Sequence, residues 1–118
     1  MHARRFTRGR YALALLVRQI TATQISFGSG VASPHQPVSI VARVARATAG
    51  RISIRVERFD PLMGWQFARR YSRRVDGGGT AAATFVPPTV GRWRARAFYF
   101  GTRTSSPSKS GFATLVVR

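Results

Sequence analysis

Arginines stand at alternate positions in several parts of this chain, a spacing that could bring their guanidinium groups onto one surface. Arg92, Arg94 and Arg96 follow one another at a period of two, and more arginines lie at 51, 55 and 69–74. A guanidinium is planar and always charged, and it can form two parallel hydrogen bonds to a phosphate or carboxylate. Anion binding is therefore the first chemistry that the pattern indicates.

The composition gives little support to catalysis or metal binding. The 118 residues include no cysteine, two histidines (His2 and His35) and three acids (Glu57, Asp60 and Asp76). General acid–base catalysis and metal binding depend on clusters of such groups, and only two of the acids are near neighbours. We expect a protein that is not an enzyme and that has no cofactor or metal site.

The net charge of +17 arises from 20 basic residues against 3 acidic ones. All the basic residues except Lys109 are arginine, which GC-rich codons can explain, although codon usage does not explain why acids are so few. Because 44% of the residues are hydrophobic, we expect one folded domain rather than an intrinsically disordered chain.

Residues 1–23 differ from the rest of the chain and form a basic N-terminal extension. Five arginines surround the apolar run YALALLV at 11–17. Three interpretations stay open for this segment: a degenerate export signal, a short amphipathic helix on an anionic surface, and a disordered extension. The apolar run is much shorter than the roughly 20 residues that cross a bilayer, so we expect no transmembrane span.

From residue 24 onward, apolar residues alternate with polar ones, which is typical of half-buried β-strands. The alternation is clearest at 91–100, where Trp93, Ala95, Ala97 and Tyr99 stand between arginines and Phe98. The pattern predicts seven strands, at 24–28, 37–45, 51–59, 66–73, 80–86, 91–100 and 112–117.

Glycine and proline clusters separate these strands, including GSGVASPHQP at 28–37, DPLMG at 60–64 and DGGG at 76–79. Glycine permits positive φ and proline fixes φ near −65°, so both favour turns. No helical periodicity lies between the strands. The chain is therefore predicted to be all-β, with an antiparallel sandwich or barrel over residues 24–118.

Three stretches of this β domain resemble bacterial immunoglobulin-like repeat domains of the Big type. They are SPHQPVSIVARV at 33–44, GRWRARAFYFG at 91–101 and SSPSKSGFATLVV at 105–117. The resemblance implies an immunoglobulin-like antiparallel β-sandwich, with Trp93 as the aromatic residue of strand F and Ala95 where antibody domains have a cysteine. The chain departs from the family in its charge, because these repeats are usually rich in threonine and neutral or acidic.

Repeats of this type occur in exported and cell-surface proteins, often in tandem. The resemblance therefore implies a structural or adhesion module at the bacterial cell surface or outside the cell, with neighbouring immunoglobulin-like domains as partners. The alternative is a basic β-domain that binds nucleic acid, in the cytoplasm or on a phage particle. A functional export signal or adjoining repeats would distinguish the two.

Outward arginines of the strands at 51–59 and 91–100 should share one face, because these strands belong to the same sheet of an immunoglobulin-like sandwich. We predict a polyanion site formed by Arg51, Arg55, Arg69, Arg73, Arg92, Arg94 and Arg96, on a face that Arg70 and Arg74 could extend. The expected ligand is an acidic polysaccharide or another polyanion, with nucleic acid as the alternative. In a second interpretation, the arginines only fill solvent-facing positions and protect sheet edges.

The aromatic residues near the arginines also allow two interpretations. Trp65, Phe67 and Tyr71 stand at even spacings, which predicts that they cover one face of a strand and pack on the core. Their position among arginines also fits a stacking platform for single-stranded nucleic acid. Phe98 and Phe100 lie on the face opposite to Trp93, where exposed aromatic residues would indicate a partner.

Overall fold

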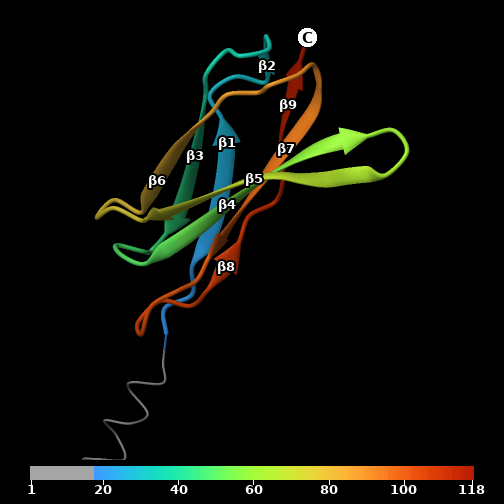
Figure 1. Ribbon diagram of the computed structural model, residues 1–118. Helices are drawn as coiled ribbons and strands as arrows, with labels where there is room; N and C mark the ends of the chain where they lie inside the picture. The colour runs from blue at the N-terminus through green and yellow to red at the C-terminus, as the bar shows by residue number, and fades with distance from the viewer. Residues whose placement is uncertain (1–17) are drawn as a thin grey trace, which may run out of the picture.

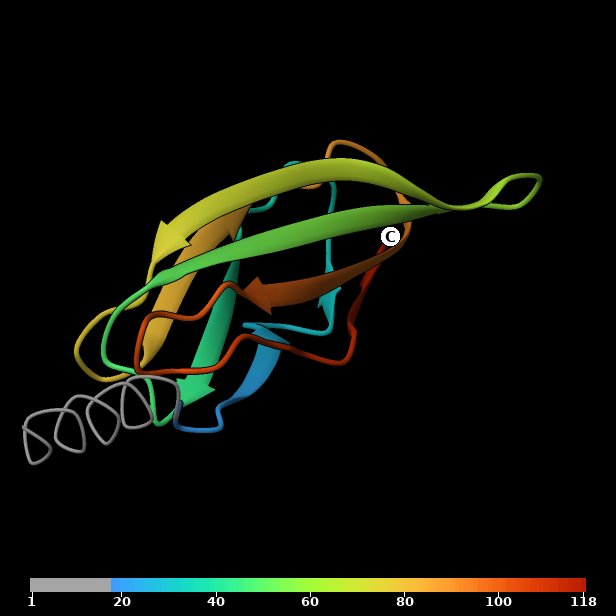
Figure 2. The ribbon, with the colours of Figure 1, turned by 90° about the horizontal axis from the view of Figure 1, so that it is seen from below.

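Two β-sheets packed face to face form the computed structural model, which describes residues 18–118 (Figures 1 and 2). The smaller sheet has the order β1-β3-β6 and contains β1 (Ala22–Phe27), β3 (Val38–Ala45) and β6 (Thr80–Phe85). The larger sheet has the order β2-β9-β7-β4-β5 and contains β2 (Val31–Ala32), β9 (Ala113–Val117), β7 (Gly91–Tyr99), β4 (Arg51–Asp60) and β5 (Gly64–Arg74), with β8 (Ser108–Lys109) added to β7.

This topology is that of an immunoglobulin-like β-sandwich, which confirms the predicted fold class. Each of the seven expected strands is present. The two further strands, β2 and β8, have two residues each, so they are too short to produce a visible alternation. Within residues 18–118 there is no helix, and hence none that could cross a membrane.

The sandwich includes residues that precede the expected start at 24. The backbone N–H of Gln19 donates a hydrogen bond to the Thr104 carbonyl at 2.8 Å, and the hydroxyl oxygens of Thr21 and Ser108 are 2.7 Å apart. The segment 19–23 therefore packs with the domain. The three interpretations of the N-terminal segment concern mainly residues 1–17, which lie outside the described residues.

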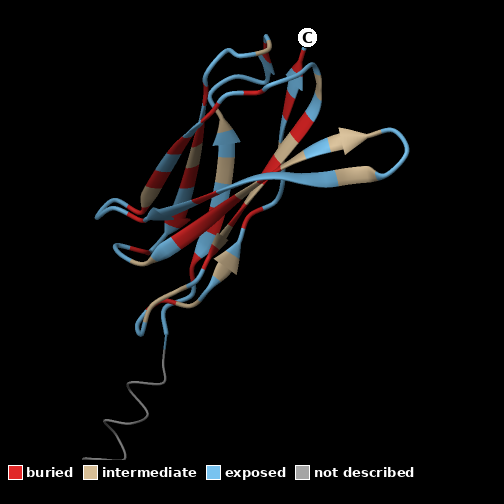
Figure 3. Cartoon of the chain, viewed as in Figure 1, coloured by how far each residue is buried: buried red, intermediate tan, exposed pale blue. Residues whose placement is uncertain are grey.

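The core lies between the sheets and comes from the alternating apolar positions (Figure 3). β3 buries every second residue from Val38 to Val44, and β7 does the same from Trp93 to Tyr99. Fully burying a large aliphatic or aromatic side chain contributes about 1.5–3 kcal/mol. Because the same alternation points the intervening residues outward, core packing also fixes where the arginines of β7 point.

A β-bulge in the β4–β5 hairpin overturns the expected placement of three aromatic residues. Val56 pairs with Arg69 but Glu57 pairs with Phe67, so Ala68 is an extra residue without a partner. The extra residue changes the phase of the alternation along β5, because side chains alternate with a period of two. Tyr71 therefore faces the core, whereas Trp65 and Phe67 lie on the outer surface. The prediction that all three pack on the core is wrong.

Candidate anion-binding face

The outer surface of β4, β5 and β7 brings seven arginines together, and we call it the arginine face. Cross-strand pairing places Arg55 opposite both Arg96 and Arg70, and Arg51 opposite Arg74. The full set is Arg51, Arg55, Arg70, Arg74, Arg92, Arg94 and Arg96. Among the strand positions whose side chains lie on this face, Glu57 is the only acidic residue. The surface is therefore strongly positive.

Five of the seven predicted site residues lie on the arginine face, and two do not. The five are Arg51, Arg55, Arg92, Arg94 and Arg96. Arg69 and Arg73 lie on the inner side of β5, because they pair with Val56 and Ile52, which are buried in the core. The expectation that these two arginines extend the same face is therefore corrected.

Arg69 and Arg73 close the edge of the sandwich instead. The Nε of Arg73 donates a hydrogen bond to the Ala82 carbonyl of β6 at 3.1 Å. The guanidinium carbons of Arg69 and Arg73 lie 5.6 and 5.4 Å from the centroid of the Tyr71 ring. These contacts join β5 to the smaller sheet and cover the rim of the core.

Arg70 and Arg74, expected only as an extension of the predicted site, belong to the face. The sequence contains one signal that could have separated them from Arg69 and Arg73. Tyr71 is the large apolar residue in this part of β5, so a period of two counted from it turns 69 and 73 inward and 70 and 74 outward.

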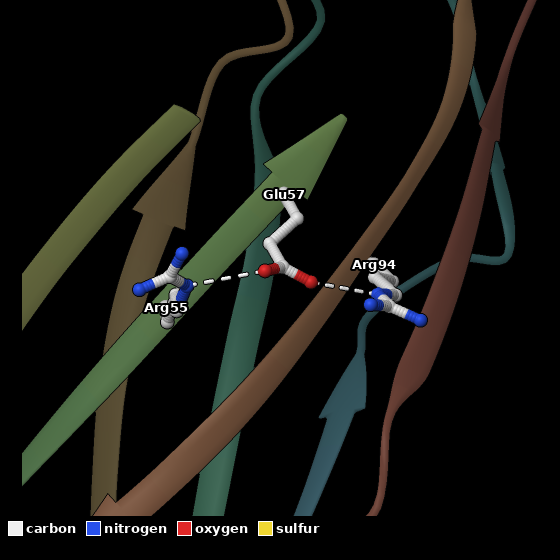
Figure 4. Close-up of polar contacts among 3 residues, drawn as sticks. All are labelled: Arg55, Glu57 and Arg94. Carbon is white, nitrogen blue, oxygen red and sulfur yellow. Dashed lines mark hydrogen bonds and ion pairs between the residues drawn. The ribbon is translucent and has the colours of Figure 1, made fainter. Parts of the chain in front are cut away.

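Glu57 lies between two arginines near the middle of the face (Figure 4). The Nε of Arg94 donates to Oε1 of Glu57 at 2.7 Å, and the Nε of Arg55 donates to Oε2 at 3.1 Å. Partial burial alone raises the pKa of Glu57, but the hydrogen bonds and charges of Arg94 and Arg55 outweigh it and hold the pKa below its ordinary value. The carboxylate therefore stays ionised and fixes the orientation of both guanidiniums.

Aromatic rings lie among the arginines and hold other guanidiniums in place. The guanidinium carbons of Arg94 and Arg96 are 3.8 and 4.0 Å from the centroid of the Phe112 ring. Arg94 is also 4.3 Å from the centroid of Trp65. Each such cation–π contact contributes about 0.5–2 kcal/mol, depending on how far it is desolvated.

Arg96, Arg55 and Arg70 form one row across β7, β4 and β5. Like charges directly opposite one another on neighbouring strands destabilise a sheet. Glu57 engages Arg55, and Phe112 lies beneath Arg96, so part of the repulsion is offset. An anion bound over the row would reduce it further.

Two shallow hollows lie along the β4–β5 side of the face. One, of about 360 Å³, is lined by Ser53, Arg55, Arg70, Phe98 and Phe100. The other, of about 380 Å³, is lined by Ala49, Gly50, Arg51, Arg74 and Val75. Each hollow contains a cross-strand pair of arginines. In the part of the chain that the structure describes, no three His, Asp or Glu side chains are grouped closely enough to hold a metal ion.

No family model matches this chain, and no curated protein matches it. Among solved structures, it is similar to the sporulation control protein Spo0M from Bacillus subtilis, with a TM-score of 0.54 and 12% identity. That match covers 83% of this chain and 49% of the Spo0M chain, and it shows a common fold alone. The chain also matches a CARDB domain from Pyrococcus furiosus, with a TM-score of 0.47, 9% identity and coverage of 87% of this chain and 93% of that one.

Proposed function

We propose that this chain is a non-enzymatic binding module that holds an anionic polymer on its arginine face. The observation that carries the proposal is the row Arg96–Arg55–Arg70, in which three like charges stand side by side on neighbouring strands. A folded protein keeps such an arrangement at some loss of stability. Binding of phosphate, sulfate or carboxylate groups would turn the repulsion into attraction, because guanidiniums form charge-assisted hydrogen bonds to these anions.

The length of the face favours a polymer over a small anion. Strands rise about 3.3 Å per residue, so the Arg51–Arg74 pair is roughly 13 Å from the Arg55–Arg70 pair along the sheet. Arg92 and Arg94 continue the positive surface along β7. A ligand with anionic groups repeated along its length could contact several of these positions together.

Among polymers, we favour an acidic polysaccharide. Guanidiniums already lie over the rings of Trp65, Phe67 and Phe112, so the surface presents charge more than open rings on which a base could stack. Single-stranded nucleic acid is the second candidate. The observation in its favour is Phe100, which is 62% exposed and lines the hollow beside Arg55 and Arg70.

We further propose that the module belongs to an exported or surface-associated bacterial protein, where it serves a structural or adhesion role beside neighbouring immunoglobulin-like domains. The support is the resemblance of segments 33–44, 91–101 and 105–117 to Big-type repeats, together with the immunoglobulin-like fold. Fractionation of cells that produce the native protein, followed by protease treatment of intact cells, tests this location. Detection only in the cytosol would contradict it.

The polymer proposal is tested by a salt series with heparin, single-stranded DNA and duplex DNA. The face variant is R70S/R92S/R96S, which leaves the two arginines that hold Glu57 intact. The control is R43S/R69S/R103S, which removes the same charge at exposed positions outside the face.

We expect the face variant to release heparin at a clearly lower salt concentration than the control variant does. Tighter binding to heparin than to either DNA supports a polysaccharide, and tighter binding to single-stranded DNA supports the second candidate. Equal losses in the two variants would contradict a specific face and would leave the net charge as the only cause of binding.

A further inference from the structure

The turn that joins β4 to β5 places two large apolar side chains side by side in solvent. Leu62 is 94% exposed and Met63 is 72% exposed. They stand at the end of the hairpin, which extends well beyond the rest of the sandwich (Figure 2). We call residues 60–64 the hairpin tip. Removal of these two side chains from water would be favourable, so the tip is a candidate contact site.

Hydrogen bonds fix the backbone of the hairpin tip. Oδ1 of Asp60 accepts hydrogen bonds from the backbone N–H groups of Leu62 at 2.8 Å and Met63 at 3.0 Å. Nε2 of Gln66 donates to the Met63 carbonyl at 3.0 Å, and Gly64 has a φ of 79°, which favours glycine. The turn therefore presents both apolar side chains on a fixed backbone, and the N–H groups of Leu62 and Met63 already have an acceptor, which lowers the cost of placing these two residues in an apolar medium.

Behind the apolar tip lies an aromatic pair of the hairpin, with two arginines of the neighbouring strand β7 beside it. Phe59 and Trp65 pack edge to face with their centroids 5.3 Å apart. The guanidinium carbon of Arg92 lies 5.1 Å from the Phe59 ring centroid, and that of Arg94 lies 4.3 Å from the Trp65 centroid. Aliphatic side chains at the tip are thus followed by aromatic side chains on the hairpin, and two guanidiniums of the neighbouring strand β7 lie beside these rings.

Proteins that bind anionic membranes use the same kinds of side chain: aliphatic residues in the hydrocarbon, tryptophan at the interface and basic residues near the negative head groups. We propose that the hairpin tip inserts Leu62 and Met63 into the surface of an anionic lipid membrane. Trp65 then lies at the interface, and Arg92 and Arg94 contact the lipid phosphates. The tip anchors the domain peripherally, and the net charge of +17 attracts it to the membrane. This inference does not rest on polymer binding, because it depends on the apolar tip.

Flotation of the full chain with vesicles of phosphatidylglycerol and phosphatidylcholine tests the proposal. The tip variant is L62S/M63S, and its control is I20S/V31S, which replaces two exposed aliphatic side chains away from the hairpin. We expect the tip variant to bind vesicles about 30-fold more weakly, equivalent to about 2 kcal/mol at 1.4 kcal/mol per factor of ten. The control should stay within about threefold of the original protein.

Tryptophan fluorescence provides a readout of insertion itself. Trp65 is half-exposed behind the tip, whereas Trp93 is 3% exposed and stays in the core. Vesicles that contain brominated phosphatidylglycerol should therefore quench Trp65 emission, and W65F should remove the quenching. The tip variant should show little quenching at equal vesicle concentration.

Several results would overturn the proposal. Equal vesicle binding by the tip variant and the original protein would mean that the arginines alone attract the vesicles. Loss of heparin retention in the tip variant would place the tip within the polymer site. Duplex DNA binding that L62S/M63S abolishes, with no change in vesicle binding, would assign the tip to nucleic acid. Failure of the polymer proposal is a separate result, namely equal losses of heparin binding in R70S/R92S/R96S and in R43S/R69S/R103S.

Discussion

Arg94 and Glu57 are direct partners on neighbouring strands, and Nε of Arg94 donates to Oε1 of Glu57 at 2.7 Å. Arg55 engages the other carboxylate oxygen from the same strand as Glu57. One carboxylate therefore orders two members of the arginine face and also reduces the charge of that face. The ordering stabilises the fold. The reduced positive charge weakens anion binding.

The variant E57Q should separate the two effects. Loss of the carboxylate removes two charge-assisted hydrogen bonds, so we expect the free energy of unfolding to fall by about 1–2 kcal/mol in urea titrations. The same change makes the face more positive, so heparin should elute at a higher salt concentration. D60N, which removes one negative charge outside the arginine face, is the control for heparin elution. Unchanged stability in E57Q would show that the pair contributes little.

Stability should depend on pH in the acidic range. Burial raises the pKa of Glu57, but the hydrogen bonds and charges of Arg94 and Arg55 lower it by more, and backbone hydrogen bonds from Met63 and Leu62 lower the pKa of Asp60. A carboxyl group with a lowered pKa in the folded state stabilises that state above its unfolded pKa. The ordinary values are 4.5 for Glu57 and 3.8 for Asp60.

We therefore expect the urea midpoint to be flat from pH 7 to about pH 5 and to fall as the pH drops through these values and below them. The fall should be smaller in E57Q, because only Asp60 then contributes. A midpoint that rises on acidification, or an identical fall in E57Q, would contradict the assignment to Glu57.

Gly50 and Tyr99 form a contact on which the loop between β3 and β4 depends. A Cβ atom at Gly50 would lie 2.8 Å from Cε1 of Tyr99, and the φ of Gly50 is 110°, so G50A should destabilise the fold by about 2–4 kcal/mol. The Tyr99 hydroxyl donates to the Ala49 carbonyl at 2.7 Å, and Y99F should destabilise by about 1 kcal/mol. Thermal unfolding of both variants tests whether G50A destabilises the fold more than Y99F does. A milder effect for G50A than for Y99F would contradict it.

Arg69 and Arg70 are adjacent on β5 but lie on opposite sides of the strand. With duplex DNA as a probe of defined charge, R70S should reduce the slope of log K against log salt by about 0.9, the value for one phosphate contact. R69S removes the same charge from the other side and should leave the slope nearly unchanged. Equal slopes for the two variants would show that the DNA does not distinguish the faces.

Local patterns in the sequence were sufficient for most of the fold. Alternation at 38–45 and 91–99, with glycine and proline turns between, gave the strands and the inward direction of Trp93 and Tyr99. Because one side of β7 must be buried, the outward direction of Arg92, Arg94 and Arg96 followed from the same pattern. The contacts of Phe112 with two of them depend on the path of the chain before β9, for which a period of two provides no information.

The sequence did not determine which side chains of β5 point toward the core and which point to the arginine face. Trp65, Phe67 and Tyr71 have even spacings, yet the bulge at Ala68 divides them between two surfaces. A bulge adds one residue on one strand only, so it becomes visible when the partner strand is known. Nothing in the residue type of Ala68 indicates it.

The bulge at Ala68 also bears on how this hairpin could change during evolution. Exchanging one side chain in β5 alters a single contact. Deleting one residue between Phe67 and Tyr71 would shift every residue on one side of the gap and would turn Trp65 and Phe67 toward the interior. Homologous chains should therefore differ in residue type here far more freely than in the number of residues between these two aromatic positions.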